Sequence, residues 1–133
     1  MRRHGFAEVI ILGGPFTDAY RAQLGDGMGF GLRLTYVPEP TPADTAGALI
    51  YAAPHLAGEF LLLNGDSFFD LNLLDFMTRT PAPGWLACLA LREVPDVARY
   101  GAVALVGDCI TRFGEKSAYG SGLINGGVYR LKR

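Results

Sequence analysis

An unbroken apolar segment that ends at an Asn-Gly-Asp turn is the feature that most constrains the fold of this chain. Residues Phe60–Leu63 are all apolar, which suits a strand covered on both faces, and Asn64-Gly65-Asp66 follows directly. Open α/β sheets bind ligands just beyond the carboxyl ends of such strands, so Asp66 is a candidate ligand or metal contact. The alternative is a simple turn in which this tripeptide caps the next element.

Short segments rich in Val, Ile and Leu alternate with segments of helical character, which is typical of βα units stacked on a mostly parallel sheet. The sequence predicts strands at Glu8–Gly13, Leu32–Val37, Phe60–Asn64, Trp85–Leu91, Ala102–Val106 and Leu123–Arg130, with a return strand at Cys109–Gly114 after the Gly107-Asp108 turn. It predicts helices at Thr17–Leu24, Asp44–Ala53 and Leu71–Thr78, with Thr17, Asp44 and Asp70 as caps.

Composition bounds the class of protein and its partners. A chain of 133 residues fits one domain, and 12 basic against 13 acidic residues argue against nucleic acid or an anionic membrane as the main partner. Cys88 and Cys109 lack a zinc or CxxC spacing, which favours reduced thiols in a cytoplasmic protein. The apolar segment Val9–Leu12 is too short for a signal peptide or a membrane span. We therefore expect a soluble, cytoplasmic protein that binds small polar ligands.

A proline-rich loop follows the second predicted strand. Pro38, Pro40 and Pro42 fix the backbone φ angles, and small residues then open a helix whose N–H groups are exposed at its N-terminus. A flat base fits against such a rigid surface, with Glu39 accepting hydrogen bonds from the amide and amino groups of the base. The alternative is a stiff connection that Asp44 caps.

Two further segments follow or begin predicted strands. Gly101 would let a ligand approach the backbone beside Tyr100, or it is an ordinary glycine at the start of a strand. Glu115 and Lys116 could divide the recognition of a phosphosugar, with the carboxylate taking hydroxyl donors and the ammonium facing phosphate. The alternative is a solvated surface pair, which is the commoner role of adjacent Glu and Lys.

Taken together and in this order, the segments resemble the nucleotidyltransferases that join a nucleoside triphosphate to a sugar 1-phosphate. The matching motifs are EPTPADTAGAL, LLLNGD, RYGAV, GEK and LINGGVY, and they extend from about Gly5 to Leu131. The chain is most similar to the guanylyltransferases that act on D-glycero-D-manno-heptose 1-phosphate or mannose 1-phosphate and form GDP-heptose or GDP-mannose. This resemblance implies a Rossmann-like, mixed and mostly parallel sheet flanked by helices.

The resemblance also assigns roles to individual residues. The resemblance assigns recognition of the base and ribose to Glu39, Pro42, Asp44, Thr45 and Gly47. Asp66 becomes the Mg²⁺ ligand and, with Lys116, a catalytic residue. Binding of the sugar 1-phosphate is assigned to Gly101, Glu115, Lys116 and Asn125. In the implied reaction a sugar phosphate oxygen attacks the α-phosphorus in line and pyrophosphate leaves, which requires orientation and charge neutralisation but no covalent nucleophile.

Several features of the family have no counterpart in the sequence. The family begins with a strand that is central in its sheet and feeds a GGxGTRL loop, whose N–H groups hold the triphosphate, and nothing similar precedes Gly5. Gly13-Gly14 lacks the later glycine and basic residue of that loop. The second metal-binding aspartate is missing before Arg133, and Asp44 stands where the family usually has glycine. We therefore expect one partial domain over residues 1–133, truncated at both ends and without the first strand.

Three hypotheses follow from these motifs. The leading one is the central portion of a sugar-phosphate guanylyltransferase that is inactive alone. The second is a non-catalytic module that binds a nucleotide sugar or sugar phosphate and regulates a partner. The third is a scaffold whose motifs are unused. The sequence leaves open the sugar, the base and whether the protein is a homo-oligomer.

Overall fold

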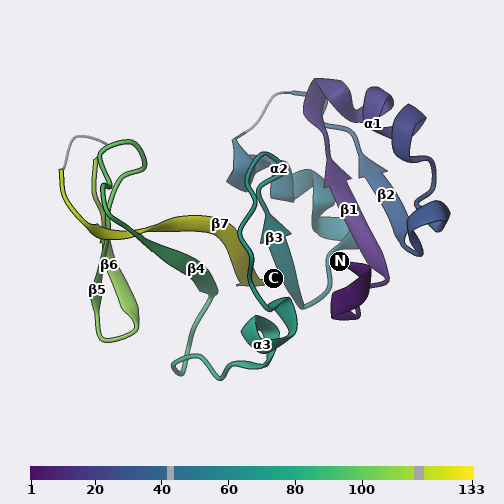
Figure 1. The fold of residues 1–133 in the computed structure, drawn as a ribbon. Helices are drawn as coiled ribbons and strands as arrows, with labels where there is room; N and C mark the ends of the chain where they lie inside the picture. Colours follow the sequence, from purple (N-terminus) through teal and green to yellow (C-terminus); the bar gives the residue numbers. More distant parts are fainter. Residues whose placement is uncertain (42–43, 116–118) are drawn as a thin grey trace. The chain divides into compact units, whose positions relative to one another are not determined.

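The computed structural model describes residues 1–41, 44–115 and 119–133, and these fall into two units (Figure 1). The first unit is Met1–Gly58 together with Arg133, and the second is Glu59–Lys132. The strands and α-helices of the first unit are β1 (Glu8–Leu12), α1 (Thr17–Leu24), β2 (Arg33–Val37) and α2 (Thr45–Ala52). Its short 3-10 helices are η1 (Arg2–His4), η2 (Gly14–Phe16), η3 (Met28–Phe30) and η4 (Ala53–His55).

The first unit is built on two parallel strands. β1 and β2 pair in register from Glu8 opposite Arg33 to Leu12 opposite Val37, so their carboxyl ends coincide. Helix α2 packs against β1 and α1 against β2, and the buried core comprises Val37, Ala48 and Ala52. Alanines on α2 allow a close approach of the helix to the strand. The loops that follow β1 and β2 therefore leave the sheet at the same edge.

The second unit contains an antiparallel sheet and a hairpin. Its elements are β3 (Glu59–Leu63), α3 (Leu73–Thr78), β4 (Ala87–Val94), β5 (Val103–Val106), β6 (Cys109–Phe113) and β7 (Gly122–Lys132). The long strand β7 lies between β3 and β4 and runs against both, while β5 and β6 form a separate hairpin (Figure 1). The buried apolar residues of this unit are Leu73, Ala90, Val97, Val103, Ile124 and Val128.

A bulge interrupts β7 at its two adjacent glycines. Leu89 of β4 pairs with Tyr129, but Leu91 pairs with Asn125, so three residues of β7 lie opposite Ala90 alone. Gly127 has a φ of 75°, a left-handed conformation that glycine adopts without strain. Extra residues of this kind bend a strand and redirect its side chains. The glycine pair of the LINGGVY motif is therefore what lets β7 bulge.

Most predicted elements are present. Helix α1 has the predicted bounds, and the strands agree to within a few residues. The expected cap of α3 at Asp70 is wrong, because Asn72 caps it by accepting hydrogen bonds from the N–H groups of Leu74 and Asp75. The pairing is mixed as expected, but the expectation that it is mostly parallel is wrong for the described strands. One pair is parallel and three are antiparallel, because β7 runs against both of its neighbours and β5 and β6 form a hairpin.

The described part of the chain contains no helix that combines the length and the apolar character needed to cross a membrane.

Candidate active site

The Glu39 side chain is held at the common carboxyl end of β1 and β2. Its Oε1 accepts a hydrogen bond of 3.1 Å from the Gly14 N–H, and the carboxylate is half-buried. Gly14 is the second residue after Leu12, and Glu39 the second after Val37, so both stand at equivalent positions beyond the last paired residues. A carboxylate thus lies at the edge where open α/β sheets bind ligands.

The other proposed nucleotide contacts lie around the start of α2. Asp44 occupies the N-cap position in an extended conformation, but its exposed side chain makes no capping hydrogen bond. Asp44 therefore occupies the cap position without donating or accepting a capping hydrogen bond through its side chain, and its carboxylate is available to interact with other charges. Gly47 is half-buried in the first turn of α2. Pro42 and the Thr45 side chain lie outside the described part of the structure.

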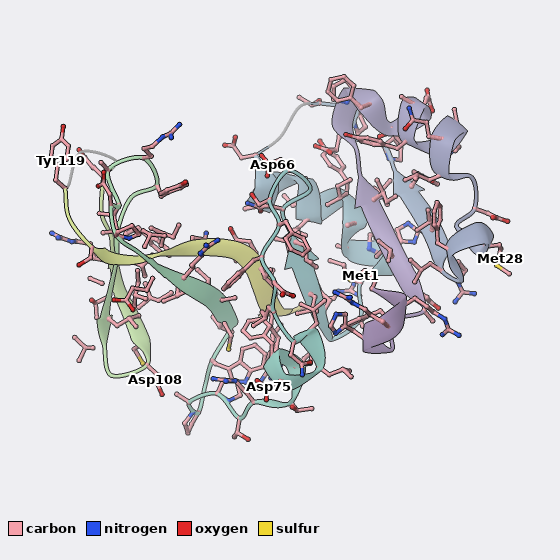
Figure 2. All side chains as sticks on the ribbon, in the orientation of Figure 1. Met1, Met28, Asp66, Asp75, Asp108 and Tyr119 are labelled. Atoms are coloured by element: carbon pink, nitrogen blue, oxygen red, sulfur yellow. The ribbon has the colours of Figure 1, made fainter. Side chains whose placement is uncertain are left out.

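Asp66 lies in the loop that follows β3, where Figure 2 labels it, and it is exposed. Its Oδ1 accepts a 3.0 Å hydrogen bond from the Ser67 hydroxyl, and it caps no helix. The expectation of a solvent-accessible carboxylate just past the end of a strand is met for this residue. No hydrogen bond or ion pair among the described residues joins Asp66 to Glu115 or Asn125.

The loop that carries Asp66 is attached to the bulge of β7. The Asn64 N–H donates to the Gly127 carbonyl at 2.9 Å, and the Asn64 side chain lies against Gly127. The Phe69 ring covers Gly126 so closely that a Cβ there would lie 2.4 Å from ring carbon Cδ1. The LLLNGD and LINGGVY motifs are therefore adjacent, and the absence of side chains at the two glycines makes the contact possible.

Asn125 uses both ends of its amide inside the second unit. Its Oδ1 accepts from the Gly127 N–H at 3.0 Å, and its Nδ2 donates to the Tyr129 hydroxyl at 2.7 Å. The residue is exposed, and Nδ2 carries a second hydrogen that can donate to a ligand. Tyr129 was not among the predicted site residues, although the LINGGVY motif places it four positions after Asn125.

Gly101 and Glu115 are neighbours in the structure. Gly101 is buried with a φ of 83°, and a Cβ there would lie 2.7 Å from the Gly114 carbonyl oxygen. The close approach at Gly101 is thus made by the chain's own backbone at Gly114 and Glu115. The Glu115 side chain is exposed, and Lys116 lies outside the described residues.

The residues present fit a magnesium ion that is bound by one carboxylate together with substrate phosphates. Among the described residues no group of three or more His, Cys, Asp and Glu side chains could hold a metal ion. Mg²⁺ is commonly bound through one or two carboxylates together with substrate phosphates and waters. An exposed Asp66 carboxylate suits that role, with the nucleotide supplying the remaining charged oxygens.

A shallow open pocket of about 270 Å³ lies elsewhere in the first unit, lined by Arg21, Gly25, Asp26, Leu34 and Tyr36. None of the proposed site residues lines it. The Arg21 guanidinium stacks over the Tyr36 ring at 5.2 Å, and the Tyr36 hydroxyl donates to the Gly25 carbonyl. These contacts fix α1 on β2, so the pocket is explained by packing.

Comparisons with known proteins converge on one group of enzymes. A family model described as nucleotidyl transferase matches residues 1–133. The chain is 31% identical over its full length to the D-glycero-alpha-D-manno-heptose 1-phosphate guanylyltransferase of Campylobacter jejuni and covers 58% of that protein. It is 33% identical over 98% of its length to the N-acetylmuramate alpha-1-phosphate uridylyltransferase of Neisseria meningitidis, of which it covers 58%.

A solved structure shows the same similarity in three dimensions. HddC from Yersinia pseudotuberculosis, crystallised with GMP-PN, has a TM-score of 0.85 and 25% identity, over 98% of this chain and 58% of that one. This similarity confirms the expected α/β fold of the nucleotide-diphospho-sugar transferase type. The chain spans about 58% of the length of these relatives.

Proposed function

Because the chain belongs to the nucleotidyl transferase family, we propose that it carries the base-recognition and sugar-phosphate-recognition parts of an enzyme that transfers a nucleotidyl group to a sugar 1-phosphate. The donor is GTP and the product a GDP-sugar, with heptose or mannose 1-phosphate as acceptor. Pyrophosphate is the second product. Two guanylyltransferase relatives, at 31% and 28% identity, support the choice of base.

The half-buried Glu39 carboxylate at the ends of β1 and β2 is the observation that carries this proposal. A carboxylate offers only acceptors, and the guanine edge presents N1–H and the exocyclic amine as adjacent donors. Asp44, Thr45, Gly47 and Pro42 surround the base and ribose in this proposal. The start of α2 supplies N–H groups that favour negative charge.

The sugar phosphate is assigned to the second unit. Glu115 accepts from sugar hydroxyls, Asn125 donates through its second amide hydrogen, and Lys116 faces the phosphate. Asp66 would hold Mg²⁺, which would neutralise phosphate charge there. The chain's own residues orient the attacking phosphate oxygen towards the α-phosphorus and balance the charge that develops.

We propose further that the 133-residue chain binds ligands but does not turn over at an appreciable rate, because its sequence has no GGxGTRL loop to hold the triphosphate. Pyrophosphate release with Mg²⁺, GTP and heptose or mannose 1-phosphate is the test. We expect no release above background. Release at about 1 s⁻¹ or faster would contradict the requirement for that loop.

Binding of the sugar phosphate alone tests the second half of the proposal. Titration calorimetry with mannose 1-phosphate should show weak binding that Lys116→Ala reduces by roughly 1.5–3 kcal/mol, the value of a charge-assisted hydrogen bond. Lys132→Ala removes the only other lysine of the chain and serves as the matched charge control. Equal affinity in the wild type and Lys116→Ala would place the phosphate elsewhere.

A non-catalytic module that binds a nucleotide sugar or sugar phosphate and regulates a partner is the second candidate. A GDP-sugar that binds more tightly than GTP, in the absence of turnover, would support this candidate over the enzyme fragment.

A further inference from the structure

We propose that the Gly14 N–H acts as a positioning group that fixes the Glu39 side chain, so that position 39 can present only one atom to the base, and that the chemical nature of this atom sets base specificity. This inference rests on the proposed function, because it assumes that Glu39 contacts the base. It extends that function by naming Gly14 as a specificity element and by predicting which substitution at position 39 weakens GDP binding most.

The register of the sheet makes the Gly14–Glu39 contact a consequence of the fold. β1 and β2 are parallel and end together at Leu12 and Val37, and the two residues stand two positions beyond these ends. The N–H of one loop therefore meets the side chain of the other across the same edge. The 3.1 Å hydrogen bond links residues 25 positions apart in sequence.

Gly14 is itself held firmly. Its carbonyl accepts a 2.8 Å hydrogen bond from the buried Thr17 hydroxyl, and its φ of 49° is left-handed. The preceding Gly13 is so crowded that a Cβ would lie 2.9 Å from Thr17 and from the Tyr20 ring. The Gly13-Gly14 turn is thus packed against α1, and the direction of the Gly14 N–H is set before any ligand binds.

The Gly14 N–H can only donate, so its partner on residue 39 must be an acceptor atom such as an oxygen. In the native protein Oε1 takes this hydrogen bond and Oε2, another acceptor, is left for the ligand. In Glu39→Gln the single amide oxygen is drawn to the Gly14 N–H, so the amide NH₂ takes the place of Oε2. The substitution therefore changes the group offered to the base from an acceptor to a donor.

This change predicts an unusual order of affinities for a base that presents N–H donors. Glu39→Ala loses the contact, but water can replace it. Glu39→Gln places a donor against a donor, which leaves both unsatisfied and costs more. GDP affinity should therefore fall in the order wild type, Glu39→Ala, Glu39→Gln, with roughly tenfold or more between the first and the last. A residue with a purely structural role would give the opposite order for the two variants.

The first measurement needs no ligand. The ¹⁵N–¹H resonance and hydrogen exchange of the Gly14 amide are compared in the wild type, Glu39→Gln and Glu39→Ala. We expect Glu39→Gln to keep the protected amide and Glu39→Ala to lose it. Asp18→Asn, which removes an exposed carboxylate of the same unit, is the charge control. A Gly14 amide unchanged in Glu39→Ala would overturn the proposal.

The second measurement is calorimetric titration of GDP with Mg²⁺ into the same proteins. GDP bound by Glu39→Gln as tightly as by Glu39→Ala, or more tightly, would overturn the fixed orientation. The Gly14 amide can behave as expected in the three proteins while the wild type binds no GDP. That combination would contradict the proposed function and the base contact, and it would support the Gly14–Glu39 hydrogen bond. The two failures are therefore distinguishable.

Discussion

At the scale of single residues, Asn125 shows how one side chain serves both the fold and the proposed site. Its amide closes the bulge through the Gly127 N–H and also holds the Tyr129 hydroxyl, so its orientation is fixed from both ends. The second Nδ2 hydrogen then has a defined direction. An amide that is fixed in this way is a better donor to a phosphate than a mobile surface side chain.

Substitutions at Asn125 should separate these two roles. In Asn125→Asp a carboxylate oxygen still accepts from the Gly127 N–H and the other accepts from the Tyr129 hydroxyl, so stability should change little. In Asn125→Ala both hydrogen bonds are lost, at a cost of about 1 kcal/mol. Urea unfolding measures the difference. The Asp variant should nevertheless lose affinity for mannose 1-phosphate, because its charge repels the phosphate.

Two results would contradict this account of Asn125. One is a loss of stability in Asn125→Asp equal to that in Asn125→Ala, which would mean that the amide nitrogen is essential for the bulge. The other is unchanged mannose 1-phosphate affinity in Asn125→Asp, which would remove the residue from the phosphate site.

Asp44 is predicted to weaken nucleotide binding. Its exposed carboxylate makes no capping hydrogen bond, so it adds negative charge at the start of α2 without a local partner among the described residues. Asp44→Gly and Asp44→Asn both keep a residue type favoured at the N-cap, and the helix should lose only a few tenths of a kcal/mol. GDP affinity measured at low salt should rise several-fold in both variants.

Salt dependence provides the control for Asp44. Because repulsion between exposed charges is screened, the gain should shrink as ionic strength rises. A gain of equal size at high salt, or no gain at low salt, would show that the carboxylate does not act on the phosphates through its charge.

Cys88 is the one described residue whose pKa shifts clearly. Burial raises the pKa of its thiol, and Glu59 adds to this, while Arg130 and Lys132 act in the opposite direction. The reactive thiolate is therefore scarce at neutral pH. We expect iodoacetamide to modify the exposed Cys109 well before the half-buried Cys88, with Cys109→Ser as the control, followed by mass spectrometry. Faster modification of Cys88 at neutral pH would contradict this prediction.

At the scale of elements, the sheet of the second unit is fixed at the end opposite the bulge by Arg130. This guanidinium is buried, with Nη2 at 2.7 Å from Glu59 Oε2 and Nη1 donating to the Arg79 carbonyl. Trp85 packs under both Arg130 and Lys132, at 4.7 and 4.6 Å. The pair links β3 to β7 and leaves the opposite end of these strands to the Asp66 loop.

The contact between Phe69 and the bulge should be sensitive to a single methyl group. Gly126→Ala places a Cβ 2.4 Å from the Phe69 ring and 2.9 Å from the Ala90 carbonyl, so the ring or the strand must move. We expect a loss of roughly 1–3 kcal/mol in urea unfolding, as for other overpacked sites. Gly65→Ala, in the loop that carries Phe69 but with open space around the Cβ position, is the control and should change stability by less than about 0.5 kcal/mol.

The same comparison tests whether the bulge positions Asp66. Amide resonances of the loop from Asn64 to Phe69 should shift in Gly126→Ala. Equal unfolding free energies in Gly126→Ala and Gly65→Ala would show that the contact between Phe69 and Gly126 does not contribute to stability.

The sequence predicted elements with strong local patterns and missed contacts that need a partner strand. Thr17 was expected as a cap, and the helix begins there, but Thr17 lies inside α1 and its hydroxyl donates to the Gly14 carbonyl. Asp70 was expected to cap α3, but Asn72 caps it; both residue types suit a cap, and only the local backbone distinguishes the two positions. Local rules therefore find a helix but do not decide its cap.

The candidate site residues show the same difference between local sequence patterns and contacts that depend on strand pairing. Gly101 and Glu115 were both assigned to the sugar 1-phosphate from the resemblance, and the contact of Gly101 with the backbone at Gly114 and Glu115 shows that these two residues are neighbours. The link between Gly14 and Glu39 was not anticipated, because it depends on β1 and β2 being parallel and in register. Once that register is known, the equal spacing after Leu12 and Val37 is enough to predict it. Tyr129 likewise reaches Asn125 only because β7 bulges between them.

At the scale of the whole molecule, few side chains are deeply buried. Among the described residues no large side chain is less than 2% exposed, and the buried core consists mainly of Ala, Val and single Leu and Ile residues. Burial of apolar surface is the dominant favourable term in folding, so we expect the chain to have modest stability. Ligands that bind the native state would add to that stability in proportion to their occupancy.

A ¹⁵N–¹H chemical-shift map of the 133-residue chain, recorded during addition of GDP with Mg²⁺ and then of mannose 1-phosphate, tests whether this chain recognises both the base and the sugar phosphate. We expect GDP to shift the amides of Gly14, Glu39, Asp44 and Gly47, and the sugar phosphate to shift those of Gly101, Glu115 and Asn125. Saturable shifts confined to other residues, or no shifts with either ligand at millimolar concentration, would contradict it.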